Sequence, residues 1–316
     1  MCIRDRLYGI ALTYGSTGST NLIHVRDYLT AVVFRDQHLL MAAMALLLVG
    51  FSFKVAAAPF HFWAPDVYQG APSPVTGWMA SVAKAAGFAA LLRVFFVAFA
   101  THEADWSPIV AVLAFITLIV GAVMAILQND VKRMLAFSSI SHAGFVLVAV
   151  QSASNKGTSA ALFYLFTYTF MVLGSFAIVG AMGADGEHPL DRYAGLGRSR
   201  PVLAMAFTIL LFAQAGVPLT SGFVGKFQVI GAAVADRSYL LAAVAMLTAV
   251  IGAFMYLRIV MAMYVADREV EGPSPTLHWT VALVLGAVTG FTILIGIVPQ
   301  FLIEFADDAV PVLIRG

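Results

Sequence analysis

Seven basic side chains occur inside long apolar stretches of this sequence, where an ion is costly to place. They are Lys54, His61, Lys84, Arg93, His142, Lys226 and Arg258. A charged side chain at the centre of a bilayer costs at least about 2.5–3.5 kcal/mol on insertion scales, so such residues usually serve ion paths or proton relays. The chemistry that this set indicates is therefore proton transfer through a membrane.

Four of these residues lie far from the ends of their stretches. Lys54, Lys84, His142 and Lys226 cannot easily extend to a lipid headgroup, and they are the candidates for a proton relay. Lysine suits that task because removal from water disfavours its ammonium form, whereas a nearby carboxylate stabilises it. The apolar stretches contain no Asp or Glu. We therefore expect the acid partner on a neighbouring subunit or on helices upstream of residue 1.

The other three basic residues have less specific interpretations. Arg93 and Arg258 lie nearer the ends of their stretches, where a long side chain can reach the interface, so an anchoring role is favoured. His61 lies near a predicted membrane surface. It could take up protons there, or it could cap carbonyl groups that a break in the helix sets free, and both interpretations remain open.

Hydroxyl groups accompany the predicted relay. The segment SSISHAGF places Ser138, Ser141 and His142 around one helix, with Ser138 and His142 four residues apart on the same face. The segment YLFTYTF adds Thr167 and Tyr168. Such groups can hold water and pass protons along a chain, but they also commonly form hydrogen bonds between membrane helices. Both interpretations remain open at this point.

The elements that must position these residues are membrane-spanning helices. Of the 316 residues, 61% are hydrophobic and 11% are charged, whereas about a quarter of the residues in soluble domains are charged. A helix of about 20 mostly apolar residues crosses a bilayer. Eight such spans are predicted, at 39–63, 75–100, 108–127, 134–150, 158–182, 202–231, 239–265 and 279–301. The predicted fold class is an all-α, polytopic helix bundle.

The first residues predict a further, partial span. The segment LYGIALTYG, which starts at Leu7, is typical of the end of an apolar helix, whereas MCIRDR resembles a translated sequencing adapter. We therefore expect residues 1–6 to be a non-native leader and the natural protein to extend upstream. A short native leader is the alternative.

Composition and motifs argue against several other classes of protein. The net charge is +1 and no basic stripe is present, which argues against a nucleic-acid partner. The single cysteine, Cys2, cannot form an internal disulfide or a cysteine metal site. No phosphate-binding glycine loop and no metal-ligand spacing occur. We expect this chain to bind no cofactor and no metal.

Two predicted spans are interrupted, and each has a lysine near the break. The breaks are expected at Pro59 and at Gly216 and Pro218, within 215–222. Proline removes a backbone donor, and lipid tolerates a break only where protein or a water-filled cavity satisfies the freed groups. A packing kink would explain either break alone. Two broken spans of opposite direction favour an inverted repeat around a transport site.

Charges in the loops predict the orientation of the chain. Loops 128–133, 183–200 and 266–278 contain six Lys and Arg residues, whereas the alternate loops contain two. Positive residues concentrate in cytoplasmic loops. The first set is therefore expected in the cytoplasm, and the C-terminus on the outer side.

The segments that carry these features resemble a known family. They are FSFKVAAAPFHFWAPDVYQGAPSPVTGWMASVAKAAGF, NDVKRMLAFSSISHAGFVLVAV, AQAGVPLTSGFVGKFQVI and YLRIVMAMY. From about Leu7 onward the chain is similar to the N subunits of NADH-quinone oxidoreductase, which is respiratory complex I. The resemblance implies antiporter-like inverted repeats, each with a broken helix. Residues 7–100 would be a remnant of the first repeat, 107–265 the second repeat, and 279–316 a C-terminal helix and tail.

The resemblance also implies roles for individual residues. The family's lysines in its two broken helices fall on Lys54 and Lys226, and the lysine of the helix after the first break falls on Lys84. The family's glutamate has no counterpart, because its helix would lie upstream of residue 1. The implied function is proton conduction across the bacterial inner membrane by a subunit of a translocase. It would be coupled to electron transfer from NADH through FMN and iron–sulfur clusters to a quinone, all bound by other subunits.

The implied partners are subunits M, K and J, with L further out, besides the lipid bilayer and the protons themselves. Two other functions remain possible on the sequence alone. One is a subunit of a related cation/proton antiporter or membrane-bound hydrogenase complex, and the other is a structural membrane scaffold.

Overall fold

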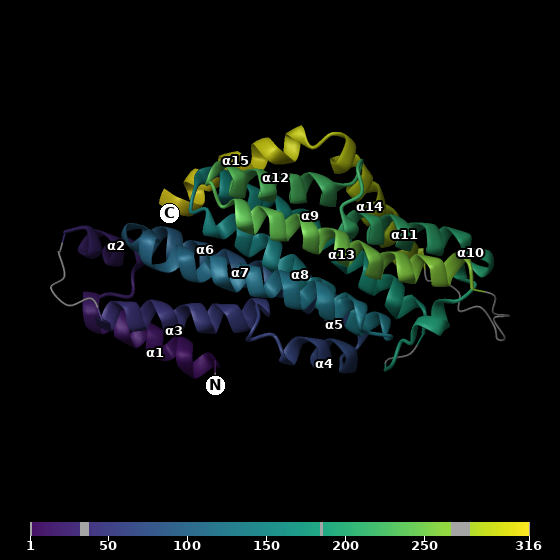
Figure 1. Ribbon diagram of the computed structural model, residues 1–316, viewed down its shortest axis with the longest axis horizontal. Helices are drawn as coiled ribbons and strands as arrows, with labels where there is room; N and C mark the ends of the chain where they lie inside the picture. The colour runs from purple at the N-terminus through teal and green to yellow at the C-terminus, as the bar shows by residue number, and fades with distance from the viewer. Residues whose placement is uncertain (1, 32–37, 184–185, 267–278, 316) are drawn as a thin grey trace.

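The computed structural model describes residues 2–31, 38–183, 186–266 and 279–315 as a bundle of helices. Most of the long helices run side by side along the longest axis, with α1 and α3 at one edge and α14 and α15 at the other (Figure 1). The helical elements are α1 (Cys2–Thr17), α2 (Leu22–Ala31), α3 (His38–Val55), α4 (Trp63–Gly70), α5 (Ser73–Trp78), η1 (Met79–Ala83), α6 (Lys84–Arg93), η2 (Val94–Ala98), η3 (Ala100–His102), α7 (Glu103–Ile126), α8 (Val131–Gln151), α9 (Asn155–Ala181), η4 (Leu190–Tyr193), α10 (Leu196–Ser199), α11 (Pro201–Ala215), α12 (Ser221–Ala235), α13 (Tyr239–Tyr264), α14 (Trp279–Ile297) and α15 (Gln300–Arg315).

The number of membrane spans agrees with the prediction. Seven helical segments among the described residues are long and apolar enough to cross a membrane. The eighth span consists of α11 and α12, which are each shorter and which divide the predicted span 202–231. In the predicted span 39–63, α3 ends early, at Val55, and the chain turns before α4 begins at Trp63. The expected all-α, polytopic fold with two broken helices is confirmed.

The N-terminal helix α1 lies along α3. Residues 2–6, which we expected to be a leader, form its first turns. Among the predicted cytoplasmic loops, 266–278 falls almost wholly on residues outside the described ranges, so its Arg268 is not placed.

The last predicted span, 279–301, is too long. Helix α14 ends before Pro299 and a separate helix, α15, follows, because proline lacks the amide donor that would continue α14. Helix α15 is amphipathic: Leu302, Ala306 and Val310, spaced by four residues, are buried, whereas its acidic residues are exposed. It packs against α9. The sequence prediction treated this helix as a tail.

Helix α8 is the centre of the bundle. It is enclosed over its whole length, because α4, α7, α9, α12 and α13 pack around it. Its contact with α7 is close: a side chain at Gly121 would overlap the backbone of Ser141, and one at Gly144 would touch Leu118. Small residues allow membrane helices to approach in this way. The polar side chains of α8 are therefore held in the interior.

The loops with the most positive charges meet at one end of the bundle, which we call the basic end. It comprises residues 127–130 and 186–200, which backbone hydrogen bonds join. At the start of α8, Arg133 forms an ion pair of 2.7 Å with Asp66 on α4. The neighbouring Lys132 is buried and donates two hydrogen bonds to carbonyl groups at the end of α4. Helix α4 is thereby fixed to α8.

The predicted span 75–100 forms one continuous helical segment, Ser73–Ala98, with two π-helical turns inside it. The first, η1, ends at the residue before Lys84, and the second, η2, follows Arg93. Such turns occur mostly as single bulges within α-helices, frequently at functional sites.

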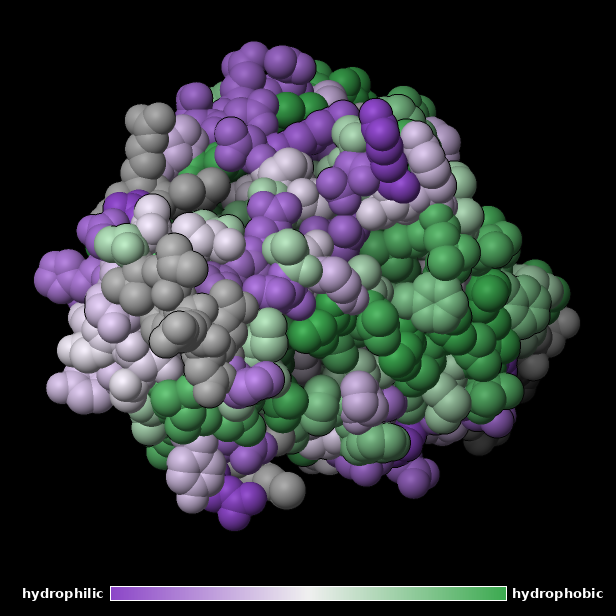
Figure 2. All heavy atoms as spheres, turned by 60° about the vertical axis from the view of Figure 1, so that its left-hand side comes forward, coloured by the Kyte–Doolittle hydropathy of each residue, from purple (hydrophilic) through white to green (hydrophobic). Residues whose placement is uncertain are grey.

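The surface of the bundle is rich in apolar side chains. In Figure 2, hydrophobic residues form a continuous area on the face shown, and hydrophilic residues gather above it and beside it. Most of the apolar residues of α13 and α14 are not buried within the bundle. These helices expose the kind of surface that a lipid bilayer covers.

Candidate functional site

The first break lies between α3 and α4, where Pro59 was expected to interrupt the helix. Its freed backbone groups find partners from neighbouring elements. Ala58 donates its N–H to Thr117 Oγ1 on α7 at 3.0 Å, and the Trp63 indole donates to the Phe53 carbonyl at 2.9 Å. The break is therefore satisfied by protein groups.

The second break lies between α11 and α12, where Gly216 and Pro218 were expected to interrupt the helix. Helix α11 ends at Ala215, and Gly216 has a φ of 89°, a left-handed conformation that glycine adopts without strain. A side chain at Gly216 would also meet the stem of Lys226. Both predicted breaks are present, and in both cases the chain resumes as a helix within a few residues.

Lys226 is buried beneath the second break. Its ammonium group donates hydrogen bonds to the carbonyl groups of Gln214 at 2.9 Å and Ala215 at 2.8 Å. These are the last carbonyls of α11, which carry the negative partial charge of the helix dipole. The same ammonium lies 5.0 Å from the centre of the Phe145 ring on α8. A helix end, rather than a carboxylate, thus faces this lysine.

Lys84 is buried at the start of α6, directly after η1. Its ammonium group donates to the backbone carbonyl of Ser139 at 2.8 Å and to the hydroxyl of the same residue at 2.5 Å. Ser139 belongs to α8. Lys84 and Lys226 therefore both reach α8, one through Ser139 and the other through Phe145.

His142 connects three helices. Its Nδ1 shares a hydrogen bond of 2.7 Å with the hydroxyl of Tyr164 on α9, and its Nε2 shares one of 3.0 Å with the hydroxyl of Tyr256 on α13. The Tyr256 hydroxyl also bonds to Ser138. The Tyr168 ring lies 4.7 Å from that of His142, between centres. The histidine is buried and both of its ring nitrogens have partners.

These contacts join into one chain of side chains through the core, which we call the interior line. Ser138 and Ser139 are adjacent in α8, and the Tyr164 ring stacks on that of Phe145 at 6.0 Å between centres. The interior line consists of Lys84, Ser139, Ser138, Tyr256, His142, Tyr164, Phe145 and Lys226.

The structure brings together some predicted residues and not others. Lys84, Ser138, His142 and Lys226 lie on the interior line. Lys54 does not: its side chain is exposed on α3. At Gly87, helix α6 packs against the first side-chain carbons of Lys54. This contact covers the base of the lysine side chain but does not bury the residue. Of the three lysines predicted for the relay, Lys84 and Lys226 therefore lie on the interior line and Lys54 lies outside it.

The predicted hydroxyl groups also divide. Ser141 is buried, but it packs against Gly121 of α7 on the side of α8 where the two backbones meet. Thr167 bonds back to carbonyl groups of its own helix, so it neither joins the interior line nor connects two helices through these bonds. Tyr168 is buried beside His142, and its hydroxyl has no hydrogen-bond partner among the described residues. Ser138 is the predicted hydroxyl that bonds within the interior line.

The three remaining basic residues lie away from the interior line. Arg258 donates to the carbonyl groups of Ile126 and Gln128 at the end of α7, which ties α13 to α7. Arg93 is exposed. His61 is buried in the first break, stacked on Phe62 with 4.6 Å between ring centres.

Sequence reasoning missed Ser139, Tyr164 and Tyr256 as members of the interior line. The tyrosines are polar residues inside predicted spans, but without the helix packing nothing marks them as partners of His142. Gln214 was also missed. Its side chain donates to Ser175 at 2.7 Å, which fixes the helix end that faces Lys226.

At the basic end, Tyr193 and His188 form a buried pair, with 3.1 Å between the tyrosine hydroxyl and Nδ1. Burial, reinforced by the nearby Asp130 carboxylate, raises the pKa of the Tyr193 hydroxyl. The hydroxyl therefore remains protonated at any physiological pH. This pair helps to hold the loop of the basic end.

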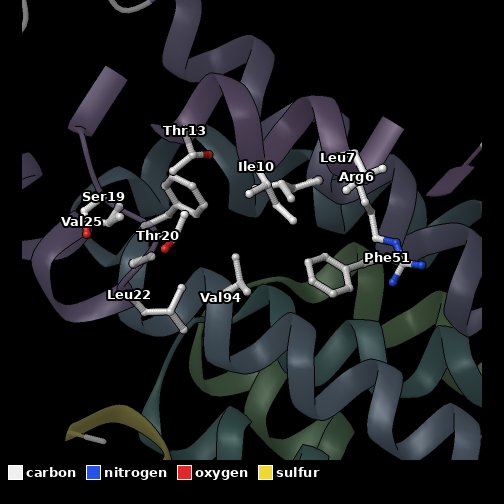
Figure 3. A pocket seen from close by; sticks show the side chains of 13 residues that line it. Arg6, Leu7, Ile10, Thr13, Ser19, Thr20, Leu22, Val25, Phe51 and Val94 are labelled. Carbon is white, nitrogen blue, oxygen red and sulfur yellow. The ribbon is translucent and has the colours of Figure 1, made fainter. Parts of the chain in front are cut away.

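A separate apolar pocket of about 430 Å³ lies between α1, α2, α3 and η2 (Figure 3). Ile10, Phe51 and Val94 point into it, and Arg6 lies at one end. Its lining includes none of the predicted site residues, so it is distinct from the interior line.

Comparison with known proteins places the chain in a family. Residues 6–252 match the family described as NADH:quinone oxidoreductase/Mrp antiporter, TM. The chain belongs to this family. Proteins named NADH-quinone oxidoreductase subunit N from Trichlorobacter lovleyi and Parafrankia sp. are 44% and 46% identical to it. Each alignment covers 96% of this chain, and 63% and 58% of the two relatives. The chain thus spans about three-fifths of their length.

Solved structures share the fold of this family member. A chain of respiratory complex I from Thermus thermophilus with bound aureothin has a TM-score of 0.78 at 33% identity, covering 100% of this chain and 66% of that one. A chain of the Mrp complex from Dietzia sp. has a TM-score of 0.88 at 23% identity, covering 99% and 66%. The latter shows similarity of fold alone. The expected resemblance is confirmed, and the family member is a multi-pass membrane protein.

Proposed function

We propose that the chain is part of an N subunit of NADH-quinone oxidoreductase and that it conducts protons across the membrane. The observation that carries this proposal is the interior line, in which two buried lysines lie at the ends of a hydrogen-bonded histidine and tyrosine network. The names of its relatives support the assignment to that complex.

Proton transfer along the interior line uses groups that both donate and accept. Hydroxyls have one proton to donate and lone pairs to accept another, and a neutral imidazole donates at one nitrogen while accepting at the other. A proton accepted at one nitrogen of His142 releases the proton on the other, so the ring passes one charge without gaining any. Tyr164 and Tyr256 stand at these two nitrogens.

Two steps of the interior line lack a hydrogen bond among the described residues. Ser138 and Ser139 are only neighbours in α8, so a proton passes between them by rotation of a hydroxyl or through a water molecule. Phe145 cannot exchange a proton. The step between Tyr164 and Lys226 therefore needs a movement of the ammonium group or a water molecule beside the ring. Since Lys226 donates hydrogen bonds to carbonyl groups at the end of α11, a shift of that helix end changes how firmly it holds its proton. The broken helix thus provides the switch for which no carboxylate exists in the spans.

Lys54 has a different place in this proposal. It is exposed and forms no hydrogen bond or ion pair with any residue that the structure describes. A charged group in this position within a membrane needs a partner. We assign that partner to an acidic side chain of a neighbouring subunit or of a preceding helix, as the sequence indicated.

The remaining features of the proposal follow from the family. The basic end faces the cytoplasm of a bacterial inner membrane, and the C-terminus lies on the outer side. Electron transfer from NADH through FMN and iron–sulfur clusters to a quinone takes place in other subunits. Subunits M, K and J are the neighbours, with L further along. Within the described residues no cluster could hold a metal ion.

The experiment that tests the proposal replaces Lys226 by methionine in the whole complex. We expect normal assembly but fewer protons translocated per NADH oxidised, measured in proteoliposomes. The matched control is Lys156→Met, which changes an exposed lysine at the opposite end of α9 from the basic end. Unchanged proton translocation in an assembled Lys226→Met complex would support a structural scaffold. Genes for M and L subunits beside this one would favour complex I over an antiporter or a hydrogenase complex.

A further inference from the structure

A groove of about 490 Å³ separates α11 from α14 on the outside of the bundle. Two glycines of α14, Gly286 and Gly290, form one wall. They lie four residues apart, hence on the same face of the helix, and a side chain at either position would meet no heavy atom within 4 Å. The groove is therefore open space between two membrane-spanning elements, and it is not filled by any residue that the structure describes.

The two ends of the groove differ in charge. Its lining along α11 runs from Arg200, the residue before that helix, to Ile209, about 14 Å at 1.5 Å per residue. This is close to half of the roughly 30 Å of hydrocarbon in a bilayer. Arg200 stands at the basic end, is only partly buried and forms no ion pair with the described residues. The rest of the lining is almost entirely apolar.

The length and charge of the groove favour a phospholipid as its occupant. Its lining extends about half-way through the hydrocarbon of a bilayer, as one acyl chain of one leaflet does. Arg200 stands where the phosphate of that lipid would lie. The groove thus matches one acyl chain of one leaflet, with a positive charge at the level of the headgroup.

We infer that this groove binds an anionic phospholipid of the leaflet at the basic end. One acyl chain lies between α11 and α14 along Gly286 and Gly290, and the phosphate group pairs with Arg200. Basic pockets between membrane helices bind anionic headgroups in this way. None of the residues that line the groove belongs to the interior line. Lipid binding in the groove can therefore be tested separately from the proposed proton conduction.

The test is photo-crosslinking in the complete membrane complex. Phosphatidylglycerol and phosphatidylcholine, each with a diazirine in one acyl chain, are incorporated into nanodiscs with the complex. After illumination, crosslinked peptides are identified by mass spectrometry. We expect crosslinks concentrated on residues 201–209 and 282–290, and more of them from phosphatidylglycerol than from phosphatidylcholine.

Two pairs of variants make the test specific. Gly290→Leu fills the groove and should lower its crosslinking to the level of the other lipid-facing helices. Gly252→Leu, at an equally open glycine on α13, should not. Arg200→Gln should reduce the preference for phosphatidylglycerol about fivefold, which is the usual effect of one basic residue at a membrane surface. Arg198→Gln, outside the groove lining, should leave the preference unchanged.

Three results would overturn the inference. Crosslinks spread evenly over the lipid-facing helices would show that the groove has no special occupant. Equal crosslinking by the two phospholipids, unaffected by Arg200→Gln, would show that no anionic headgroup is recognised. Absence of lipid crosslinks from 201–209 and 282–290, with peptides of another subunit found there instead, would show that a protein covers the groove.

Discussion

Replacing Tyr256 by phenylalanine tests whether protons pass through the interior line. The change removes one hydroxyl, which bonds both to His142 Nε2 at 3.0 Å and to Ser138, and leaves the ring in its place. Two hydrogen bonds at about 1 kcal/mol each are lost. If the hydroxyl is part of the proton route, about 2 kcal/mol added to the barrier slows transfer through the chain roughly 30-fold.

Two further variants calibrate this result. Tyr164→Phe removes one hydrogen bond to His142, so the loss of about 1 kcal/mol predicts roughly fivefold slower transfer. Tyr239→Phe changes an exposed tyrosine at the start of the same helix as Tyr256 and should have no effect. The order of the three variants is therefore part of the prediction.

The assay measures protons translocated per NADH oxidised by the assembled complex in proteoliposomes. The reference is Lys226→Met, which defines the value reached when the share of this chain is lost. We expect Tyr256→Phe to approach that value. If its ratio equals that of the wild type while Lys226→Met lowers it, the Tyr256 hydroxyl is not on the proton route and the interior line is only a packing network.

Three further predictions concern other parts of the structure. Lys84→Met should lower protons per NADH as Lys226→Met does, without loss of assembly; a normal ratio would exclude Lys84 from the route. Lys132→Met should lower the thermal stability of the solubilised complex more than Arg133→Ala. Lys132 is buried and donates two hydrogen bonds at the end of α4, whereas Arg133 makes its ion pair with Asp66 and its hydrogen bonds to Gln69 and Gln128 at a partly exposed site, where an ion pair is worth about 1 kcal/mol or less. Equal unfolding temperatures would contradict this. Gly121→Ala should separate α7 from α8 and cost about 1–3 kcal/mol of stability. Gly252→Ala has room for its methyl group and should be neutral or slightly stabilising. Similar unfolding temperatures for the two variants would refute the close contact between α7 and α8.

Most of the fold could be predicted because apolar length is a strong signal in a membrane. The positions of Pro59 and Gly216 marked the two breaks, since no continuous α-helix accommodates them easily. The division of the last predicted span was missed. Phe301 and its neighbours are as apolar as α14, so composition extended the span past Pro299, and the amphipathic pattern of α15 is visible only after that proline is taken as a boundary.

The candidate site was predicted less completely than the fold. Lys84, His142 and Lys226 were identifiable because a buried cation is exceptional in any apolar stretch. Tyr164 and Tyr256 were not, because tyrosine is common in membrane helices and their role depends on helices far apart in sequence meeting at His142. The exposure of Lys54 depends likewise on what packs against α3, which the local sequence does not contain.

The π-helical turn η1 has a consequence for the direction of Lys84. Each residue of an α-helix turns the chain by about 100°, and a π turn accommodates one residue in excess. Without η1, the side chain of Lys84 would point about 100° away from its present direction and would miss Ser139. The direction of the Lys84 side chain thus depends on the π turn formed by the five residues before it, Met79–Ala83. A helical wheel drawn for the whole segment would have placed Lys84 on the wrong face.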